Sequence, residues 1–246
     1  MEYILIGFVS LFTSVLSAIA GGGGGLLTGP AMLLIGFSPN VVVASQKAGG
    51  IGVNLGAMTK FIKHPSLIQW KLGVGLSVLA VVASYIGTSV VFRFSEDAIR
   101  DFIGVIVLVM VPVIYLRRKD GLKQRATTQV QKIFGTIVYG FILTVQAAVG
   151  GGIGTLNMYV LMGPMGLDAL QANATKRLVG LTVTVSSLLF FIGSGYVDWK
   201  LAGVSFISTL IGGSIGAGVA IEKGAGFVRQ VLIVVSIVMA IILLID

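Results

Sequence analysis

The chain carries two glycine clusters, GGGGGLL at positions 21–27 and GGGIGTL at positions 150–156, which begin 129 positions apart. Further blocks match in the same order at nearly the same spacing: ASQK (44–47) with ATKR (174–177), IQWKL (68–72) with VDWKL (197–201), and SYIG (84–87) with GSIG (213–216). Several blocks at one offset indicate an internal repeat. The sequence therefore predicts a duplication, with a first repeat at 1–120, a connecting loop at 121–130 and a second repeat at 131–246.

The composition indicates a membrane protein. Of the 246 residues, 56% are hydrophobic and only 11% are charged, and the mean hydropathy is +1.02. Several apolar runs approach the roughly 20 residues that a helix needs to cross a bilayer. We therefore expect an all-α polytopic integral membrane protein. The predicted spans are 3–20, 41–59, 72–92, 99–116, 131–149, 178–193, 200–221 and 227–245, and two shorter apolar stretches, 26–37 and 155–167, follow the glycine clusters.

The formal net charge of +8 comes largely from segments that flank these spans, above all 60–71 and 117–132. Loops rich in Lys and Arg are typical of the cytoplasmic side of a membrane. Both segments are therefore predicted to be cytoplasmic, in the inner membrane of a prokaryote, and the charge does not indicate a nucleic-acid partner.

No residue pattern predicts an enzyme. The sequence has no cysteine, which excludes disulfides and thiolate chemistry. It also lacks paired carboxylates, histidine-based metal spacing and a nucleophile–base set. We therefore expect no catalytic residues, no metal site and no cofactor.

Each repeat is predicted to contain a helix, a glycine break, a short helix, a long helix, a Trp-Lys loop and two further helices. If the short helix counts as a crossing, each repeat has five segments and the second repeat is inverted. Otherwise four plus four segments run parallel. The 60–71 loop holds three lysines, whereas its repeat partner at 191–200 holds one Lys and one Asp, and this asymmetry favours inversion. Trp70 and Trp199 are expected to be interface anchors.

The glycine clusters are predicted to interrupt helices. Each glycine is about 1 kcal/mol less favourable than alanine inside a helix, and a membrane tolerates unwound backbone only where it lines a cavity or lies inside the protein. Freed N–H groups at the start of a short helix can hold an anion. Broken helices at matching places in two repeats point to a transport site. The alternative is that the glycines only allow helices to cross closely.

Lys47 lies a few residues inside the predicted span 41–59, and Lys176 and Arg177 occupy the matching place in the second repeat. None of these three basic residues has an acidic residue within one helical turn. Charges at membrane depth usually face a cavity or a partner, and an excess of positive charge suits an anion. On a helix, Lys176 and Arg177 point about 100° apart, so we expect Lys47 and only one of this pair to meet the ligand. The alternative is that all three extend their long stems to the membrane surface.

Small polar side chains gather near the clusters and could donate hydrogen bonds to an oxyanion, although such residues also join neighbouring helices. The predicted substrate-binding set contains glycines of both breaks, nearby polar residues and the three cations: Gly22, Gly23, Gly24, Gly25, Thr28, Ser45, Gln46, Lys47, Gly151, Gly152, Gly154, Asn157, Asn173, Thr175, Lys176 and Arg177.

The duplicated glycine cluster, the Ala-Ser/Thr segment about twenty residues after each cluster and the Trp-Lys loops resemble the sulfite exporter TauE/SafE family of membrane permeases. The resemblance covers essentially the whole chain. It implies secondary transport of a small anion such as sulfite, sulfoacetate or another organosulfur compound. The chain departs from an even repeat in having Gln46 where the second half has Lys176, so the two sides of the site need not be equivalent.

The expected function is therefore a secondary transporter of a small anion that works by alternating access between the two repeats. The expected partners are that anion and the lipid bilayer, and a homodimer is a further possibility. An anion-selective channel could use the same glycines and cations as a filter. A membrane scaffold is the third alternative.

Overall fold

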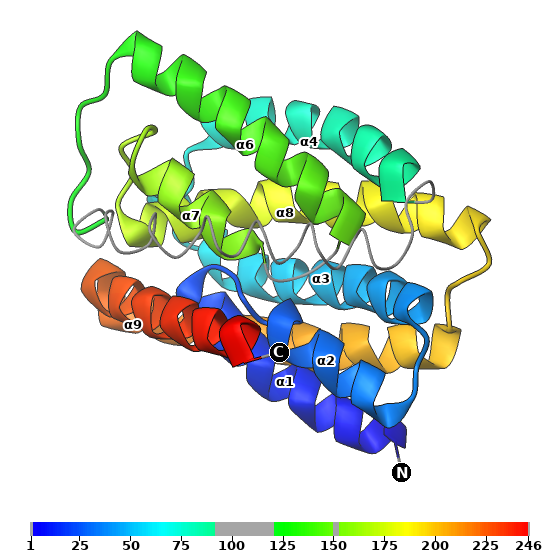
Figure 1. Ribbon diagram of the computed structural model, residues 1–246. Coiled ribbons are helices and arrows are strands. Elements are labelled where there is room, and N and C mark those ends of the chain that lie inside the picture. Colours follow the sequence, from blue (N-terminus) through cyan, green and yellow to red (C-terminus); the bar gives the residue numbers. More distant parts are fainter. Residues whose placement is uncertain (1, 92–120, 150–152, 246) are drawn as a thin grey trace.

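The computed structural model describes residues 2–91, 121–149 and 153–245. Helices make up all the regular secondary structure of these residues (Figure 1). They are α1 (Glu2–Ala20), α2 (Gly25–Ile35), α3 (Pro39–Phe61), the short 3-10 helix η1 (Pro65–Leu67), α4 (Trp70–Val91), α6 (Gln129–Val149), α7 (Gly154–Met162), α8 (Ala169–Gly193) and α9 (Trp199–Ile245).

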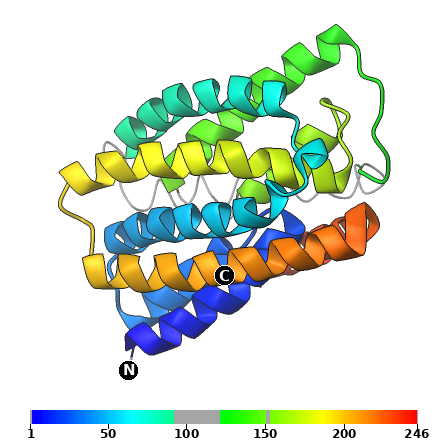
Figure 2. The same ribbon diagram turned by 180° about the vertical axis from the view of Figure 1, so that it is seen from behind.

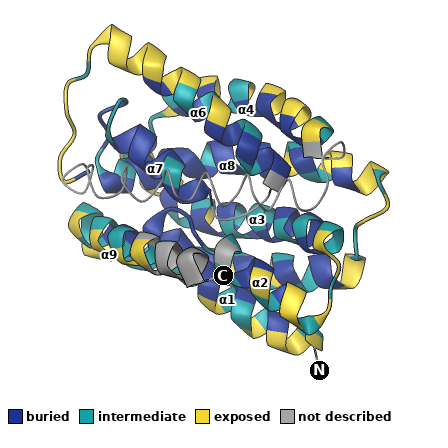
Figure 3. Cartoon of the chain, viewed as in Figure 1, coloured by how far each residue is buried: buried dark blue, intermediate teal, exposed yellow. Residues whose placement is uncertain are grey.

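Five of the described helices, α1, α4, α6, α8 and α9, are long and apolar enough to cross a membrane. The predicted polytopic all-α protein is confirmed at this level. Helix α3 has 23 residues, but it carries Gln46, Lys47 and Asn54 and lies among the other helices, where much of it is buried (Figure 3). Its polar side chains face protein, so α3 does not need the hydropathy of a lipid-facing helix.

Two predicted boundaries need correction. Helix α8 begins at Ala169 and not at 178, because its polar first half is buried and hydrogen-bonded. Asp168 caps it by accepting from the backbone N–H groups of Leu170 at 2.9 Å and Gln171 at 2.8 Å. Helix α7 ends at Met162 instead of 167. The predicted span 99–116 lies outside the described residues.

Helix α9 is two helices that meet at Gly224, whose backbone (φ 77°, ψ −178°) is not helical. Only glycine adopts this conformation readily. The break falls between the predicted spans 200–221 and 227–245, which are confirmed as separate helices.

Helices α1, α3 and the part of α9 before Gly224 form one layer and run in the same direction. Along α3 and α9, Gly49 lies beside Ser205 and Gly56 lies beside Leu210, so residue numbers rise together. Helices α1 and α9 also run in the same direction, because residue numbers rise together along their contact. A Cβ atom at several of these glycines would meet the backbone of the neighbouring helix. In these helices, therefore, glycines do serve close packing.

Helices α4, α6 and α8 form the second layer (Figure 1). They also run in one direction, because Leu79 lies against Gly140 and Gly87 against Thr144 further along α4 and α6. The two layers meet along α3 and α8, which run antiparallel: Gly50 contacts Thr184, whereas Asn54 contacts Gly180.

The basic loops lie at one end of the molecule (Figure 2). The backbone N–H of Gln69 donates to Thr175 Oγ1 at 3.0 Å, and that of Ala169 donates to the Gly121 carbonyl at 2.9 Å. Loops 62–69 and 121–128 therefore both meet the beginning of α8. The N-terminus and the 194–198 loop lie at the opposite end, where Tyr3 contacts Asp198.

Trp70 and Trp199, the predicted interface anchors, begin α4 and α9 and are partly exposed, at 42% and 66%. They lie at the two opposite ends of the molecule, as side chains at two membrane surfaces would.

Candidate functional site

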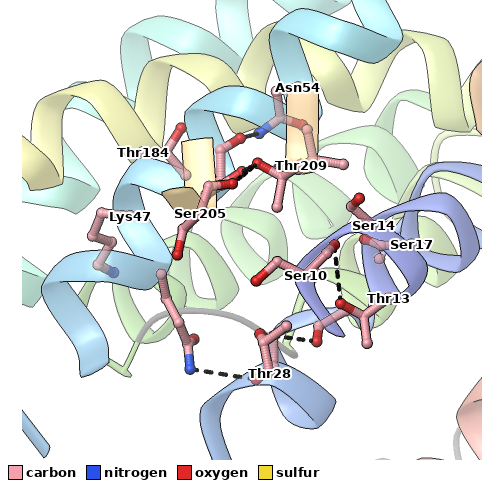
Figure 4. A pocket seen from close by; sticks show the side chains of 18 of the residues that line it. Ser10, Thr13, Ser14, Ser17, Thr28, Lys47, Asn54, Thr184, Ser205 and Thr209 are labelled. Carbon is pink, nitrogen blue, oxygen red and sulfur yellow. Dashed lines mark hydrogen bonds between the residues drawn. The ribbon is translucent and has the colours of Figure 1, made fainter. Parts of the chain in front are cut away.

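A cavity of about 100 Å³ lies between the two layers, against the first glycine break (Figure 4). This space is several times what a single water molecule needs. Its wall contains these predicted residues: Gly22, Gly23, Gly24, Gly25, Thr28, Ser45, Gln46, Lys47, Gly154, Lys176 and Arg177. The fold thus brings most of the predicted set together from both halves of the chain.

The two glycine breaks touch one another. The chain leaves the helix after Ala20, and Gly21 (φ 78°) and Gly23 (φ 99°) adopt left-handed conformations that favour glycine. A Cβ atom at Gly22 would lie 2.6 Å from the carbonyl carbon of Gly154 and 2.7 Å from the backbone nitrogen of Thr155. The backbones of the two breaks therefore pack directly together. The predicted residues Gly151 and Gly152 lie outside the described residues.

Helix α2 starts at the cavity wall, where Gly24, Gly25 and Thr28 line the space. The carbonyl of Gly24 accepts from the backbone N–H groups of Leu27 and Thr28, both at 3.1 Å. The N–H groups that precede these in the first turn of a helix have no acceptor within the helix. Together with the helix dipole, they make this part of the wall favourable for negative charge.

Lys47 reaches from α3 to the end of α6 in the other half of the chain. Its Nζ donates to the carbonyls of Gln146 at 2.9 Å and Ala147 at 2.6 Å, and it lies 5.9 Å from the centre of the Phe191 ring. Carbonyls of the last helical turn lack partners within the helix and carry the negative end of its dipole. The ammonium group of Lys47 donates hydrogen bonds to these carbonyls and places its positive charge at the negative end of the dipole.

Arg177 and Lys176 do the same for the end of α1. Arg177 Nη2 donates to the carbonyls of Ser17 at 2.8 Å and Ala18 at 3.2 Å, and Lys176 Nζ donates to the carbonyl of Gly21. Basic residues of each half thus cap the interrupted helix of the other half. All three side chains are almost completely buried, so they do not extend to the membrane surface.

The expectation that only one of Lys176 and Arg177 faces the cavity is wrong, because both line it. Their side chains diverge, but the end of α1 lies between them. Each reaches a different carbonyl of the stretch from Ser17 to Gly21, so the cavity wall includes both.

Three predicted residues, Asn157, Asn173 and Thr175, do not belong to the described cavity wall. Asn173 Nδ2 donates to the carbonyls of Ala18 at 2.8 Å and Ile19 at 3.0 Å, and its Oδ1 accepts from Arg177. Thr175 accepts from the backbone of Gln69, and Asn157 donates to Gln146 Oε1 at 2.6 Å. These contacts join elements of the fold, which is the alternative role considered for them.

Other hydroxyl groups line the cavity without having been predicted as ligands: Ser10, Thr184, Ser187, Ser205 and Thr209. Figure 4 shows Ser10 and Ser205 turned towards the same central space. One signal was available in the sequence, because Thr184 occupies the repeat position of Asn54. Ser205 and Thr209 lie one turn apart in a largely apolar stretch of α9, a spacing that equally suits helix packing.

The cavity wall contains three basic side chains and, among the described residues, no Asp or Glu. The described part of the chain also has no group of three His, Cys, Asp or Glu side chains that could hold a metal ion. The arrangement therefore offers a small space lined by basic side chains, helix N–H groups and hydroxyl donors.

A polytopic helical protein with interrupted helices around such a central cavity belongs to the class of membrane transporters. A sequence profile of the sulfite exporter TauE/SafE family matches residues 6–243. The chain belongs to this family and is a multi-pass membrane transporter.

Bacterial relatives agree with this assignment. The chain is 28% identical over 241 residues to the "Probable membrane transporter protein YfcA" of Escherichia coli (strain K12), covering 97% of this chain and 88% of the relative. It is 24% identical over 234 residues to a "Probable membrane transporter protein" of Haemophilus influenzae, covering 95% and 90%. No solved structure matches the chain.

Proposed function

We propose that the protein is a secondary transporter of a small anion, carried through the central cavity by alternating access between the two halves. The single observation that supports this most is the wall of the cavity, where Lys47, Lys176 and Arg177 meet without a carboxylate among the described lining residues. The substrate class that we propose, sulfite, sulfoacetate or a related organosulfur anion, follows from the family name.

We further propose that the two halves are an inverted repeat. Repeat-matched helices run in opposite directions: α1 points towards the end with the basic loops and α6 points away from it, and α3 and α8 are antiparallel. The layer of α1 and α3 takes its third helix, α9, from the second half, and the layer of α6 and α8 takes α4 from the first. Two such layers that rock against each other around a fixed central site would provide alternating access.

A carrier fits the cavity better than a channel. The space holds about 100 Å³ and lies beside the contact between the two glycine breaks, whose backbones touch. A channel needs a continuous path with weak successive sites. We propose that the contact between Gly22 and Gly154 opens during transport, as a conformational cycle requires.

Counterflow in proteoliposomes tests this function. Vesicles loaded with unlabelled sulfite should accumulate radiolabelled sulfite from outside and then release it, because a carrier exchanges substrate through one site. The initial rate should saturate with external sulfite. Flux that does not saturate, together with single-channel currents in planar bilayers, would show that the channel alternative is correct.

The same assay addresses the substrate class. Unlabelled sulfoacetate, acetate and chloride are added outside as competitors at equal concentration. We expect sulfoacetate to inhibit uptake of labelled sulfite more strongly than acetate or chloride does. If chloride competes as well as the sulfur anions, the organosulfur assignment fails while the anion carrier stands.

A further inference from the structure

We infer that Ser45, Ser187 and Ser205 form an uncharged oxyanion-binding subsite inside the cavity, and that their hydroxyl groups contact the substrate directly. This inference rests on the proposed function and names side chains for it. All three residues line the cavity, and their exposed fractions are 0%, 0% and 2%. Each buried Oγ atom has no hydrogen-bond partner among the described residues.

The three serines come from α3, α8 and α9 and lie within about one helical turn of each other along these helices. A Cβ atom at Gly49 of α3, one turn after Ser45, would lie 3.7 Å from Ser205 Cβ. On the other side of α3, Gly50 contacts Thr184, and Lys47 faces Phe191. Ser187 lies between these two positions of α8, so all three hydroxyls belong to the level of the α3 stretch from 45 to 50.

Their lack of partners is unusual for serines in helices. A Ser or Thr hydroxyl in a helix can bond to the carbonyl one turn earlier. Neighbouring residues do this: Thr184 Oγ1 donates to the Gly180 carbonyl at 2.7 Å, and Thr209 Oγ1 donates to the Ser205 carbonyl at 2.7 Å. Buried polar groups are nearly always satisfied, so three unsatisfied hydroxyls in the lining of one cavity are placed to bind a ligand.

The surrounding charge identifies the ligand as a hydrogen-bond acceptor. A hydroxyl can donate or accept, but the cavity wall combines three cations with no carboxylate among its described residues. The cations donate to carbonyls of α1 and α6. They therefore stabilise a negative ligand through space, and the hydroxyls are placed to supply direct hydrogen bonds to an anion with several oxygen atoms.

The test measures binding of sodium sulfite to the purified full chain in detergent by calorimetry, together with the melting temperature of each variant. Ser45→Ala, Ser187→Ala and Ser205→Ala should each weaken binding by about tenfold, the usual effect of losing one hydrogen bond to a charged group. Their melting temperatures without sulfite should stay the same or rise, because the removed hydroxyl has no partner in the protein.

Ser84→Ala is the matched control. Ser84 is equally buried, but it lies outside the cavity wall and donates to the carbonyls of Ala80 at 2.7 Å and Val183 at 3.3 Å. Its replacement should lower the melting temperature and leave sulfite affinity unchanged.

Two results would overturn the inference alone. In both, the wild-type chain transports sulfite and the serine variants bind it as tightly as the wild type. If the melting temperatures of the serine variants equal that of the wild type, the three hydroxyls bind no ligand. If the melting temperatures fall as for Ser84→Ala, the three hydroxyls hold structural water. A wild-type chain that neither binds nor carries sulfite or sulfoacetate would instead overturn the proposed function and the subsite together.

Discussion

Arg177 illustrates how a buried cation can serve the fold and the site at once. It is 1% exposed, and its guanidinium group bonds to carbonyls of α1, to Asn173 of its own helix and, at 3.4 Å, to Asn54 of α3. The planar fork of an arginine can hold several acceptors in fixed directions, which a lysine cannot. Three helices therefore depend on this one side chain next to the cavity.

Replacing Arg177 with methionine should reduce stability before it reveals anything about binding. The substitution leaves the carbonyl of Ser17 and the Oδ1 atom of Asn173 without the donor that Arg177 supplies, at a cost of about 3 kcal/mol or more. We expect a clear drop in the melting temperature in detergent and a lower yield of folded protein. Lys132→Met, at an exposed position of α6, should change neither. If Arg177→Met melts like the wild type but loses sulfite binding, the arginine is a direct ligand and not a helix cap.

At the level of helices, the contact between the two glycine breaks sets how closely the halves approach. Gly22 meets the backbone of Gly154 and Thr155, so no side chain fits between them. Basic side chains cap the ends of α1 and α6 near this contact, and α2 and α7 begin beyond it.

Gly22→Ala should separate the breaks. The added methyl group would overlap backbone atoms that cannot move independently, and such overpacking typically costs about 1–3 kcal/mol. We expect a lower melting temperature and a loss of sulfite counterflow. Gly75→Ala is the control, because a Cβ atom there meets nothing within 4 Å, and it should be neutral or stabilise α4 by up to about 1 kcal/mol. Normal flux through the Gly22→Ala variant would show that the close contact is not needed for transport.

The elements could be predicted from the sequence better than the site. Apolar runs and glycine clusters directly reflect the cost of burying polar backbone in a membrane, so spans and breaks were identified. The beginning of α8 was missed because Lys176, Arg177 and Asn173 do not look like membrane residues. Their burial depends on carbonyls of α1 that lie more than 150 residues away in the chain.

The hydroxyl groups of the cavity could not be chosen from the sequence for a related reason. A serine in an apolar helix has the same local pattern whether it bonds to its own helix, joins a neighbour or faces a ligand. Ser84 and Ser187 are both buried, and only their surroundings distinguish them. Ser205 comes from a helix that packs with the opposite half, so its place beside Gly49 depends on the tertiary fold.

For the whole molecule, the two ends differ in charge. One end holds the basic loops 62–69 and 121–128, and the other holds the N-terminus and the 194–198 loop with Asp198. Loops rich in Lys and Arg are typical of the cytoplasmic side, so this asymmetry predicts that the end with the basic loops faces the cytoplasm.

Single cysteines can test that orientation without background, because the chain has no cysteine of its own. Ser66 is exposed in η1, and Tyr196 is 40% exposed in the opposite loop, whereas nearby Ser194 is only half-exposed. In intact spheroplasts, a membrane-impermeant maleimide should label Tyr196→Cys but not Ser66→Cys. After permeabilisation both should react. Equal labelling of both sites before permeabilisation would support the parallel arrangement.

The exchange of helices between the halves also governs how the protein can be made. Helix α3 carries Lys47 and Asn54, and it packs against α9, which begins about 140 residues after α3 ends. At about 5–20 residues per second, a ribosome takes roughly 7–28 s to reach that point. During this time α1 and α3 have entered the bilayer without the helix that completes their layer, and the partners of their polar groups, such as Gln146 and Arg177, are still being synthesised. The first half therefore cannot complete its packing on its own. Until the second half has been synthesised, the insertion machinery or contacts among its own helices must stabilise it in the bilayer.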